Sequence, residues 1–192
     1  MKLVLATASP HRIKLLRSTG LKFRAQTAPV DESVITGTTP KRLARARADA
    51  KAKSMALCLK NSVVIGADQV LELEGRSFDK AKTPHEAELR LKRFRGKTHL
   101  LHSAFVIYVS HGDGKVRRAV SKVVSVKMKM RALTDREIRT YLHTNEWRGC
   151  VGCYQYENLG VHLFDNVSHD HSSIIGLPLL TLLRELRLLG LT

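Results

Sequence analysis

The sequence predicts a mixed α/β fold in one domain spanning residues 1–192. Three observations predict it. Apolar runs of strand length alternate with helical patterns along the chain, and capping signals mark where those helices begin. No internal repeat, low-complexity segment or linker divides the sequence, and 192 residues are enough to bury a core without disulfides.

The first third of the chain reads as a strand, two helices and a second strand. Residues 2–6 have the composition of a strand. A helix is expected to begin at Pro10, because proline suits the first helical turn, and to stop near Gly20. A helical pattern rich in Ala, Lys and Arg follows over 40–59, and 62–67 then reads as a buried strand.

The rest of the chain predicts a hairpin and three further helices. Two capping boxes, at Thr83 and Thr134, each place a glutamate three residues after a threonine at the start of a helical pattern. Residues 111–114 favour a turn and lie between two long β-rich runs, which predicts an antiparallel hairpin. In order, the expected elements are an alternating strand over 70–73, a helix to 95, strands over 98–110 and 116–130, a helix to about 143 and a helix over 178–189.

The charge balance favours anionic partners. A net charge of +16, from 33 Lys and Arg against 17 Asp and Glu, attracts nucleotides, RNA or DNA. Aromatic residues make up only 5% of the chain, and no cluster of them alternates with arginine as a single-strand stacking platform requires. A nucleic-acid partner is therefore less favoured than a nucleotide. The alternative function is a non-enzymatic nucleic-acid- or nucleotide-binding regulatory protein that uses the basic surface.

No segment predicts a membrane protein. The apolar start of the chain is too short for the core of a signal peptide. The apolar run over 174–183 is too short to span a bilayer, and Arg184 interrupts its continuation. Three cysteines, an odd number, give no disulfide framework, so we expect a protein of the reducing cytoplasm.

Residues 7–12 lie between the first expected strand and helix and form a candidate anion site. Ser9 is an expected N-cap, and the free backbone N–H groups and the dipole at the start of a helix attract phosphates. Arg12 would add a permanent charge. The same residues also fit a capped surface helix with an ordinary arginine.

Three further positions could carry chemistry on a phosphate or a metal. Asp68 ends the expected strand 62–67, where α/β sheets collect ligands, and could hold a metal or activate water. Asp31 and Glu32 form a carboxylate pair that could supply oxygen ligands to Mg²⁺. Lys80, just before a helix, could meet a phosphate. Each also has an ordinary explanation, as a turn cap, a surface acid or a solvated lysine.

Two segments have only a superficial likeness to metal sites. Cys150 and Cys153 form a C-x-x-C pair, but a zinc site needs further ligands at compatible spacing, and we expect small buried residues in a strand there. Residues 168–171 contain two histidines and an aspartate with nothing to fix their geometry. We interpret them as a polar loop.

Taken in order, motifs along essentially the whole chain resemble those of the Maf family of nucleotide pyrophosphatases. The resemblance joins several separated segments, which makes it specific. The matching segments are LATASPHR at 5–12, VDE at 30–32, LARARA at 43–48, GADQV at 66–70, DK at 79–80, GKTH at 96–99, YQYENLG at 154–160 and IIGLPL at 174–179.

The resemblance implies an elongated α/β fold, with a mixed sheet flanked by helices and two lobes around a cleft. It also implies a homodimer and a divalent metal, Mg²⁺ or Mn²⁺. The implied reaction is hydrolysis of a nucleoside triphosphate to its monophosphate and pyrophosphate, in the housecleaning of non-canonical nucleotides. The implied site residues are catalytic Asp68, Glu32 and Lys80, with Glu32 and Asp68 also as metal ligands, and substrate-binding Ser9, Arg12, Arg47, Gln69 and Glu157.

The chain departs from the family pattern at several positions. His11 stands where the family usually has arginine, which removes a permanent charge from the phosphate cradle. Arg47 replaces the usual lysine, and Ala81 replaces a common proline. Gln69 and Glu157 resemble the branch associated with 7-methyl-GTP rather than the branch that prefers dTTP and UTP.

Overall fold

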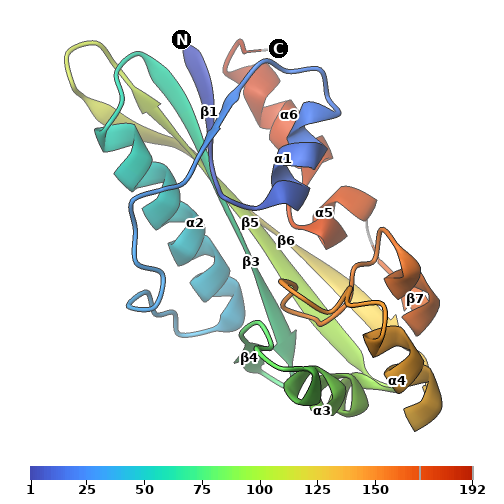
Figure 1. The fold of residues 1–192 in the computed structure, drawn as a ribbon. Helices are drawn as coiled ribbons and strands as arrows, with labels where there is room; N and C mark the ends of the chain where they lie inside the picture. The colour runs from blue at the N-terminus through green and yellow to red at the C-terminus, as the bar shows by residue number, and fades with distance from the viewer. Residues whose placement is uncertain (169, 192) are drawn as a thin grey trace.

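The computed structural model describes residues 1–168 and 170–191 and contains one mixed seven-stranded sheet with helices on both faces (Figure 1). The strands lie in the order β2-β1-β3-β5-β6-β7, and β4 pairs with β3. The elements are β1 (Lys2–Ala6), α1 (Pro10–Arg17), β2 (Arg24–Gln26), α2 (Pro40–Leu57), β3 (Ser62–Leu73), β4 (Arg76–Phe78), α3 (Pro84–Phe94), β5 (Thr98–Ser110), β6 (Val116–Met130), α4 (Asp135–Leu142), the short 3₁₀ helix η1 (Leu159–Leu163), β7 (Phe164–Val167), α5 (His171–Ile175) and α6 (Leu179–Leu188).

Three long strands run from one end of the molecule to the other. β3, β5 and β6 pair antiparallel along most of their length, whereas β1 pairs parallel with β3 and with β2 at one end only. We call the end with β1, β2, α1, α2 and α6 the first lobe, and the end with β4, α3, α4 and β7 the second lobe (Figure 1). The expected fold, a mixed sheet flanked by helices in two lobes, is confirmed.

Small residues bring α2 close to β3. Ala44, Ala48 and Ala52 are buried on the helix face that covers the sheet, and Gly66 lies against that face in β3. A Cβ atom at Gly66 would lie 2.3 Å from the backbone oxygen of Ala48, closer than the two atoms can approach. Glycine therefore sets the spacing between helix and sheet. Lys51 lies on the same buried face of α2.

α1 and α6 cover the opposite face of the first lobe's sheet (Figure 1). Leu16 of α1 and Leu182 and Leu186 of α6 are fully buried against apolar side chains of β1, β3 and β5. Successive residues of a strand point to opposite faces. Val64 of β3 therefore packs with α2, whereas the next residue, Ile65, packs with α1 and α6.

An aromatic cluster around His99 lies in the core of the second lobe. His99 is only 1% exposed and stacks on Phe94, with the ring centroids 5.0 Å apart. Its Nε2 atom lies 2.7 Å from the hydroxyl oxygen of Tyr154. Burial lowers the pKa of His99 to about 4. The folded protein therefore holds this imidazole neutral at neutral pH.

Most of the expected elements are present close to their expected positions. The two hairpin strands have the expected bounds, and the capping box at Thr134 is complete. At Thr83 the side-chain oxygen accepts a hydrogen bond from the N–H of Glu86. The Glu86 carboxylate, however, accepts from the N–H of Lys82 rather than from that of Thr83, so this capping box is only half formed.

The expected end of the strand at Asp68 is wrong. β3 continues to Leu73, so Asp68 lies in its middle, opposite Ala104 of β5. Antiparallel pairing with β5 supplies backbone hydrogen bonds beyond Gly66, where parallel pairing with β1 ends. Patterns in the sequence also do not predict β2, β7 and α5, because segments of three to five residues are too short to show a clear periodicity.

Within residues 1–168 and 170–191, no helix is both long enough and apolar enough to cross a membrane. Helix α2, with 18 residues, carries lysines and arginines along its length.

Replacing His99 with glutamine should make stability less sensitive to acid. Because folding lowers the pKa of His99 to about 4, the unfolded chain binds a proton below about pH 6.5 that the folded chain does not bind. His99 adds no pH dependence above that value. As the pH falls from there to about 4, it should remove roughly 3 kcal/mol from the free energy of unfolding. Urea unfolding at a series of pH values measures this loss.

The matched control for His99→Gln is His85→Gln, because His85 is exposed at the start of α3. His85→Gln should lose stability in acid as the wild type does, whereas His99→Gln should lose less. Equal losses in the wild type and His99→Gln would show that the buried imidazole does not set the acid response.

Candidate active site

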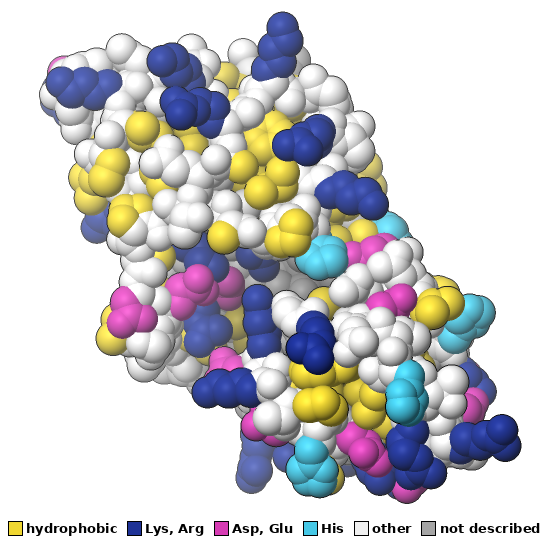
Figure 2. Space-filling model, in the orientation of Figure 1, with side chains coloured by type: hydrophobic (Ala, Val, Ile, Leu, Met, Phe, Trp, Pro, Cys, Tyr) yellow, Lys and Arg dark blue, Asp and Glu magenta, His cyan; other side chains and the backbone are white. Residues whose placement is uncertain are grey.

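A cleft of about 1000 Å³ separates the two lobes. Figure 2 shows a hollow at the waist of the molecule, where acidic and basic side chains gather. The first lobe lines the cleft with the turn between β1 and α1, the loop before α2, and residues of α2 and β3. The loops over 79–82 and 148–157 line it from the other side.

Lys51 places its ammonium group between two carboxylates in this cleft. Its Nζ atom lies 2.8 Å from Oδ1 of Asp68 and 2.7 Å from Oε2 of Glu32. Lys51 and Asp68 are 8% and 6% exposed, whereas the side chain of Glu32 is 45% exposed. Buried charges need partners of opposite sign, and here two carboxylates share one ammonium. The group as a whole keeps an excess negative charge.

The two carboxylates fit a divalent metal ion. The Oδ2 atom of Asp68 is buried and has no hydrogen-bond partner among the residues that the structure describes. Leaving such an atom unsatisfied costs free energy unless a ligand meets it. The described residues contain no cluster of three potential metal ligands, but Mg²⁺ commonly binds one or two carboxylates together with water and substrate phosphates. Asp68 and Glu32 are the residues that would hold such an ion.

The turn before α1 contributes one wall of the cleft. The side-chain oxygen of Thr7 accepts a hydrogen bond from the N–H of Ser9, and Ser9 caps α1. Nε of Arg12 donates to the backbone oxygen of Gly176 at 3.0 Å. Burial lowers the pKa of Arg12, and the charges of the two carboxylates oppose that shift. An arginine stays protonated under these conditions, so a fixed cation lies beside the carboxylates.

Arg47 and Lys80 add positive charge from the two sides of the cleft. Arg47 lies on α2 one turn before Lys51, and its Nη2 atom is 3.9 Å from Oδ1 of Asp79. The Nε atom of Arg47 is buried without a hydrogen-bond partner in the described part of the chain. Lys80 is exposed and lines the cleft. Together with Arg12, these residues offer three cations to an anionic ligand.

Gln69 follows Asp68 in β3, so its side chain points to the opposite face of the sheet. Its Nε2 atom donates to Oγ of Ser103 at 2.8 Å and to the backbone oxygen of Ile174 at 2.9 Å. These bonds tie α5 to the sheet. Gln69 also lines the cleft, and a ligand there would meet it as a hydrogen-bond acceptor, because both of its N–H bonds are engaged.

Glu157 reaches α1 from the opposite wall. Its Oε1 atom lies 2.8 Å from Nδ1 of His11, and the ring nitrogen must donate, because an ionised carboxylate only accepts. The side chains of His11 and Glu157 are 34% and 21% exposed. The contact connects segments 146 residues apart in sequence and keeps a carboxylate in the lining of the cleft.

Lys51 is a functional candidate that the sequence analysis does not find. The match of 43–48 to the family's L-A-x-x-K-A segment places the lysine position at Arg47, one helical turn away. A signal is nevertheless present in the sequence. Lys51 falls on the same helix face as Ala44 and Ala48, and a lysine within a buried alanine stripe needs a charged partner.

Three other candidate groups contribute no cluster of three metal-ligating side chains within residues 1–168 and 170–191. Cys150 and Cys153 lie in a loop rather than in the expected strand, and both thiols are free. Burial raises the pKa of Cys150 to about 12, which disfavours the thiolate that metals bind. Asp31 is exposed and accepts hydrogen bonds from a neighbouring serine. Asp170 caps α5, and His169 lies outside the described residues.

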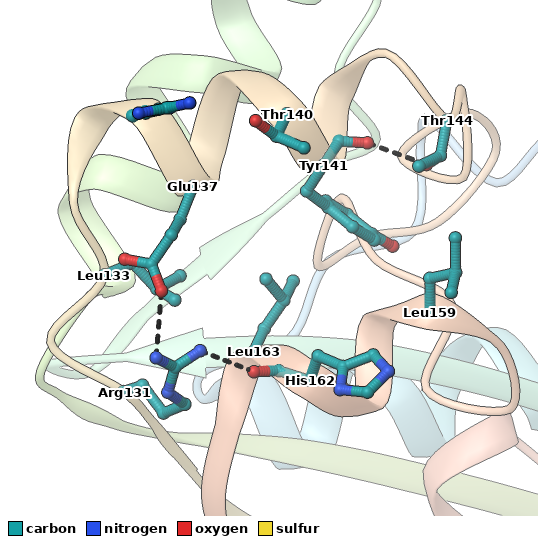
Figure 3. A pocket seen from close by; sticks show the side chains of 10 residues that line it. Arg131, Leu133, Glu137, Thr140, Tyr141, Thr144, Leu159, His162 and Leu163 are labelled. Atoms are coloured by element: carbon teal, nitrogen blue, oxygen red, sulfur yellow. Dashed lines mark hydrogen bonds and ion pairs between the residues drawn. The ribbon is translucent and has the colours of Figure 1, made fainter.

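A second cavity, of about 340 Å³, lies between α4 and η1 (Figure 3). Leu133, Leu159 and Leu163 line it. At its edge, Nη2 of Arg131 donates to Oε1 of Glu137 at 2.9 Å. None of the site residues expected from the sequence lines this cavity. The larger cleft is therefore the candidate active site.

Comparison with known proteins agrees with the sequence motifs. A 7-methyl-GTP pyrophosphatase of Bartonella quintana is 40% identical over 195 residues, which cover 98% of this chain and 96% of the relative. A nucleoside triphosphate pyrophosphatase of Nitrobacter hamburgensis is 43% identical over 196 residues, which cover 98% of this chain and 94% of the relative.

A solved structure, the Ham1 protein of Staphylococcus aureus, is 19% identical, covers 69% of this chain and 73% of its own, and has a TM-score of 0.41. This similarity is too weak to support a conclusion about fold or function. The sequence model described as Maf-like protein, by contrast, matches residues 2–189. The chain belongs to the Maf family.

Proposed function

We propose that this protein is a nucleoside triphosphate pyrophosphatase, which hydrolyses its substrate to a nucleoside monophosphate and pyrophosphate. The names of two relatives, matched over nearly the whole chain, support this reaction. The observation that carries the proposal is the Lys51 ammonium held between Asp68 and Glu32, in a cleft that Arg12 also lines. Buried, interacting charges in a cleft are typical of reactive sites.

The cationic walls of the cleft would hold the triphosphate. Arg12 and Arg47 approach from the first lobe and Lys80 from the facing loop. The N–H groups at the start of α1, next to Ser9, attract phosphate oxygens through the helix dipole. These contacts would fix the α-phosphorus near the carboxylates of the cleft.

Hydrolysis joins a water oxygen to the α-phosphorus and breaks the bond between that phosphorus and the oxygen it shares with the β-phosphate. The electron pair of the broken bond leaves with pyrophosphate, and the proton of the water passes to a carboxylate of Asp68 or Glu32. Lys51 orients both carboxylates through its two contacts. Arg12 and Lys80 would stabilise the negative charge that builds on the leaving group.

We also propose that Asp68 and Glu32 bind Mg²⁺ or Mn²⁺. Lys51 contacts one oxygen of each carboxylate, and Oδ2 of Asp68 is the buried oxygen without a partner among the described residues. A divalent ion there would supply charge to the phosphates and polarise the attacking water. The homodimer and the cytoplasmic location stay predictions, which light scattering and cell fractionation would check.

We propose a modified purine nucleotide, 7-methyl-GTP, as the substrate. The relative from Bartonella quintana carries that name. Glu157 offers the cleft a carboxylate, which accepts hydrogen bonds from the N–H groups of a guanine edge and complements the positive charge of a 7-methylated base. Gln69 adds an acceptor on the sheet side.

The wild-type protein with Mg²⁺ or Mn²⁺ should release pyrophosphate from a panel of nucleoside triphosphates that includes 7-methyl-GTP. Asp68→Asn should lower kcat by at least about a hundredfold, because an amide neither takes the proton nor binds the metal as a carboxylate does. Asp165→Asn is the matched control, because Asp165 is exposed on β7 and does not line the cleft. No release by the wild type, or an undiminished rate in Asp68→Asn, would refute the proposal.

Replacing Lys51 with methionine should lower both stability and kcat. The change leaves the buried carboxylate of Asp68 without its partner at 2.8 Å. Breaking a buried ion pair in this way costs roughly 3–5 kcal/mol. Equilibrium unfolding in urea measures the cost, and Lys53→Met is the matched control, because Lys53 is exposed on the same helix.

The double variant Lys51→Met/Asp68→Asn separates loss of the ion pair from loss of packing. It should recover part of the stability that Lys51→Met loses, because the lysine and its buried carboxylate partner are then both neutral. If the double variant is no more stable than Lys51→Met, the cost does not come from the unpaired carboxylate.

The contact between His11 and Glu157 should couple the two side chains in substrate binding. Because the ring N–H holds the carboxylate, His11→Ala and Glu157→Gln should each raise KM for the preferred nucleotide. The double variant should raise KM by less than the product of the two single effects, since both changes remove one shared interaction. Effects that simply multiply would mean that the two residues act independently.

A further inference from the structure

Positive charge is concentrated at one end of the molecule. The first lobe, taken as residues 1–68, 104–123 and 171–192, carries 19 Lys and Arg against 6 Asp and Glu. The rest of the chain carries 14 Lys and Arg against 11 Asp and Glu. The first lobe therefore holds +13 of the net charge of +16.

On one side of the sheet, this charge lies on α1 and α6. Lys14 and Arg17 of α1 and Arg184 and Arg187 of α6 are exposed, and within the described residues none of the four forms an ion pair. Glu185, the acidic residue of α6, is paired with a lysine of β6. Figure 2 shows lysine and arginine side chains spread over this upper half with very few acidic ones.

The positive surface continues around the edge of the sheet. β2 is an edge strand, with Arg24 in it and Lys22 just before it, both exposed. Beyond that edge, on the opposite face, α2 presents further exposed cations, again without ion pairs in the described part of the chain. They are Lys41, Arg42, Arg45 and Lys53. We call the exposed cations of α1, α6, β2 and α2 the basic band.

The basic band is separate from the active-site cleft. None of its ten cations, including Lys22 just before β2, lines the cleft, whose own cations come from other positions. A nucleotide bound in the cleft would not contact the band. The band's charge therefore has no direct role in holding the substrate of the proposed reaction.

We propose that the basic band binds the phosphate backbone of single-stranded nucleic acid. The cations lie on both faces of the sheet and on the edge between them, and a flexible strand can follow such a curved path, whereas a flat membrane meets one face only. With few aromatic residues in the chain, 5% in all, the phosphate contacts rather than base stacking would carry the affinity. Phosphate contacts carry no sequence information, so binding is independent of sequence. This function is additional to the proposed pyrophosphatase reaction.

The test compares two charge reversals on matched helices. Arg184→Glu/Arg187→Glu changes two exposed arginines of α6 that are three residues apart. Arg136→Glu/Arg139→Glu reverses two exposed arginines with the same spacing on α4 of the second lobe, where Arg139 also lies 3.9 Å from Glu88. The probe is a fluorescein-labelled RNA of about 20 nucleotides, read by fluorescence anisotropy as salt rises from about 50 to 200 mM. Thermal unfolding and pyrophosphate release show that each variant is folded and has an intact cleft.

The wild type should bind the RNA with an affinity that falls steeply with salt. The α6 variant should bind at least about tenfold more weakly, with a salt slope shallower by about 1.4, because each lost contact with a single strand removes about 0.7. The α4 variant should stay within about threefold of the wild type. No binding by the wild type, equal losses in both variants, or a preference for phosphatidylserine vesicles over RNA would overturn the proposal.

Discussion

The close approach of α2 to β3 is the constraint on which the active site depends. Lys51 reaches Asp68 only because Gly66 and the alanines above it let the helix lie against the sheet. A side chain at Gly66 would meet the backbone of α2, so the helix would move away and carry the ammonium with it. The small residues between α2 and β3 are therefore required to place the buried charge of Lys51.

The long strands impose a second constraint, because both walls of the cleft are attached to one continuous sheet. β3 and β5 pair over eleven residue positions, from the first lobe into the second, so no flexible linker separates the lobes. Besides the sheet, side chains that meet across the cleft connect its two walls, as His11 and Glu157 do. Partly exposed contacts of this kind contribute little stability, so the contact serves to place the Glu157 carboxylate rather than to hold the fold together.

Local signals in the sequence predict the helices and the hairpin well, because caps and turns depend on neighbouring residues. Ser9 and Thr134 cap the helices at which their motifs place them. The predicted strand end at Asp68 is wrong. Backbone pairing with β5, whose residues lie more than thirty positions away in sequence, overrides the low strand propensity of aspartate. Lys51 is not predicted for a related reason. Its partners Glu32 and Asp68 lie in other segments of the chain, and only tertiary packing brings them to it.

Two kinds of electrostatic interaction coexist in the first lobe, and salt distinguishes them. Lys51 and Asp68 are in contact at 2.8 Å and both side chains are largely buried, so mobile ions weaken this pair little. The cations of the basic band act through solvent, where the Debye length is about 8 Å at physiological ionic strength. Their combined field draws any polyanion towards the lobe. The cleft can therefore keep its charge arrangement at salt concentrations that abolish long-range attraction.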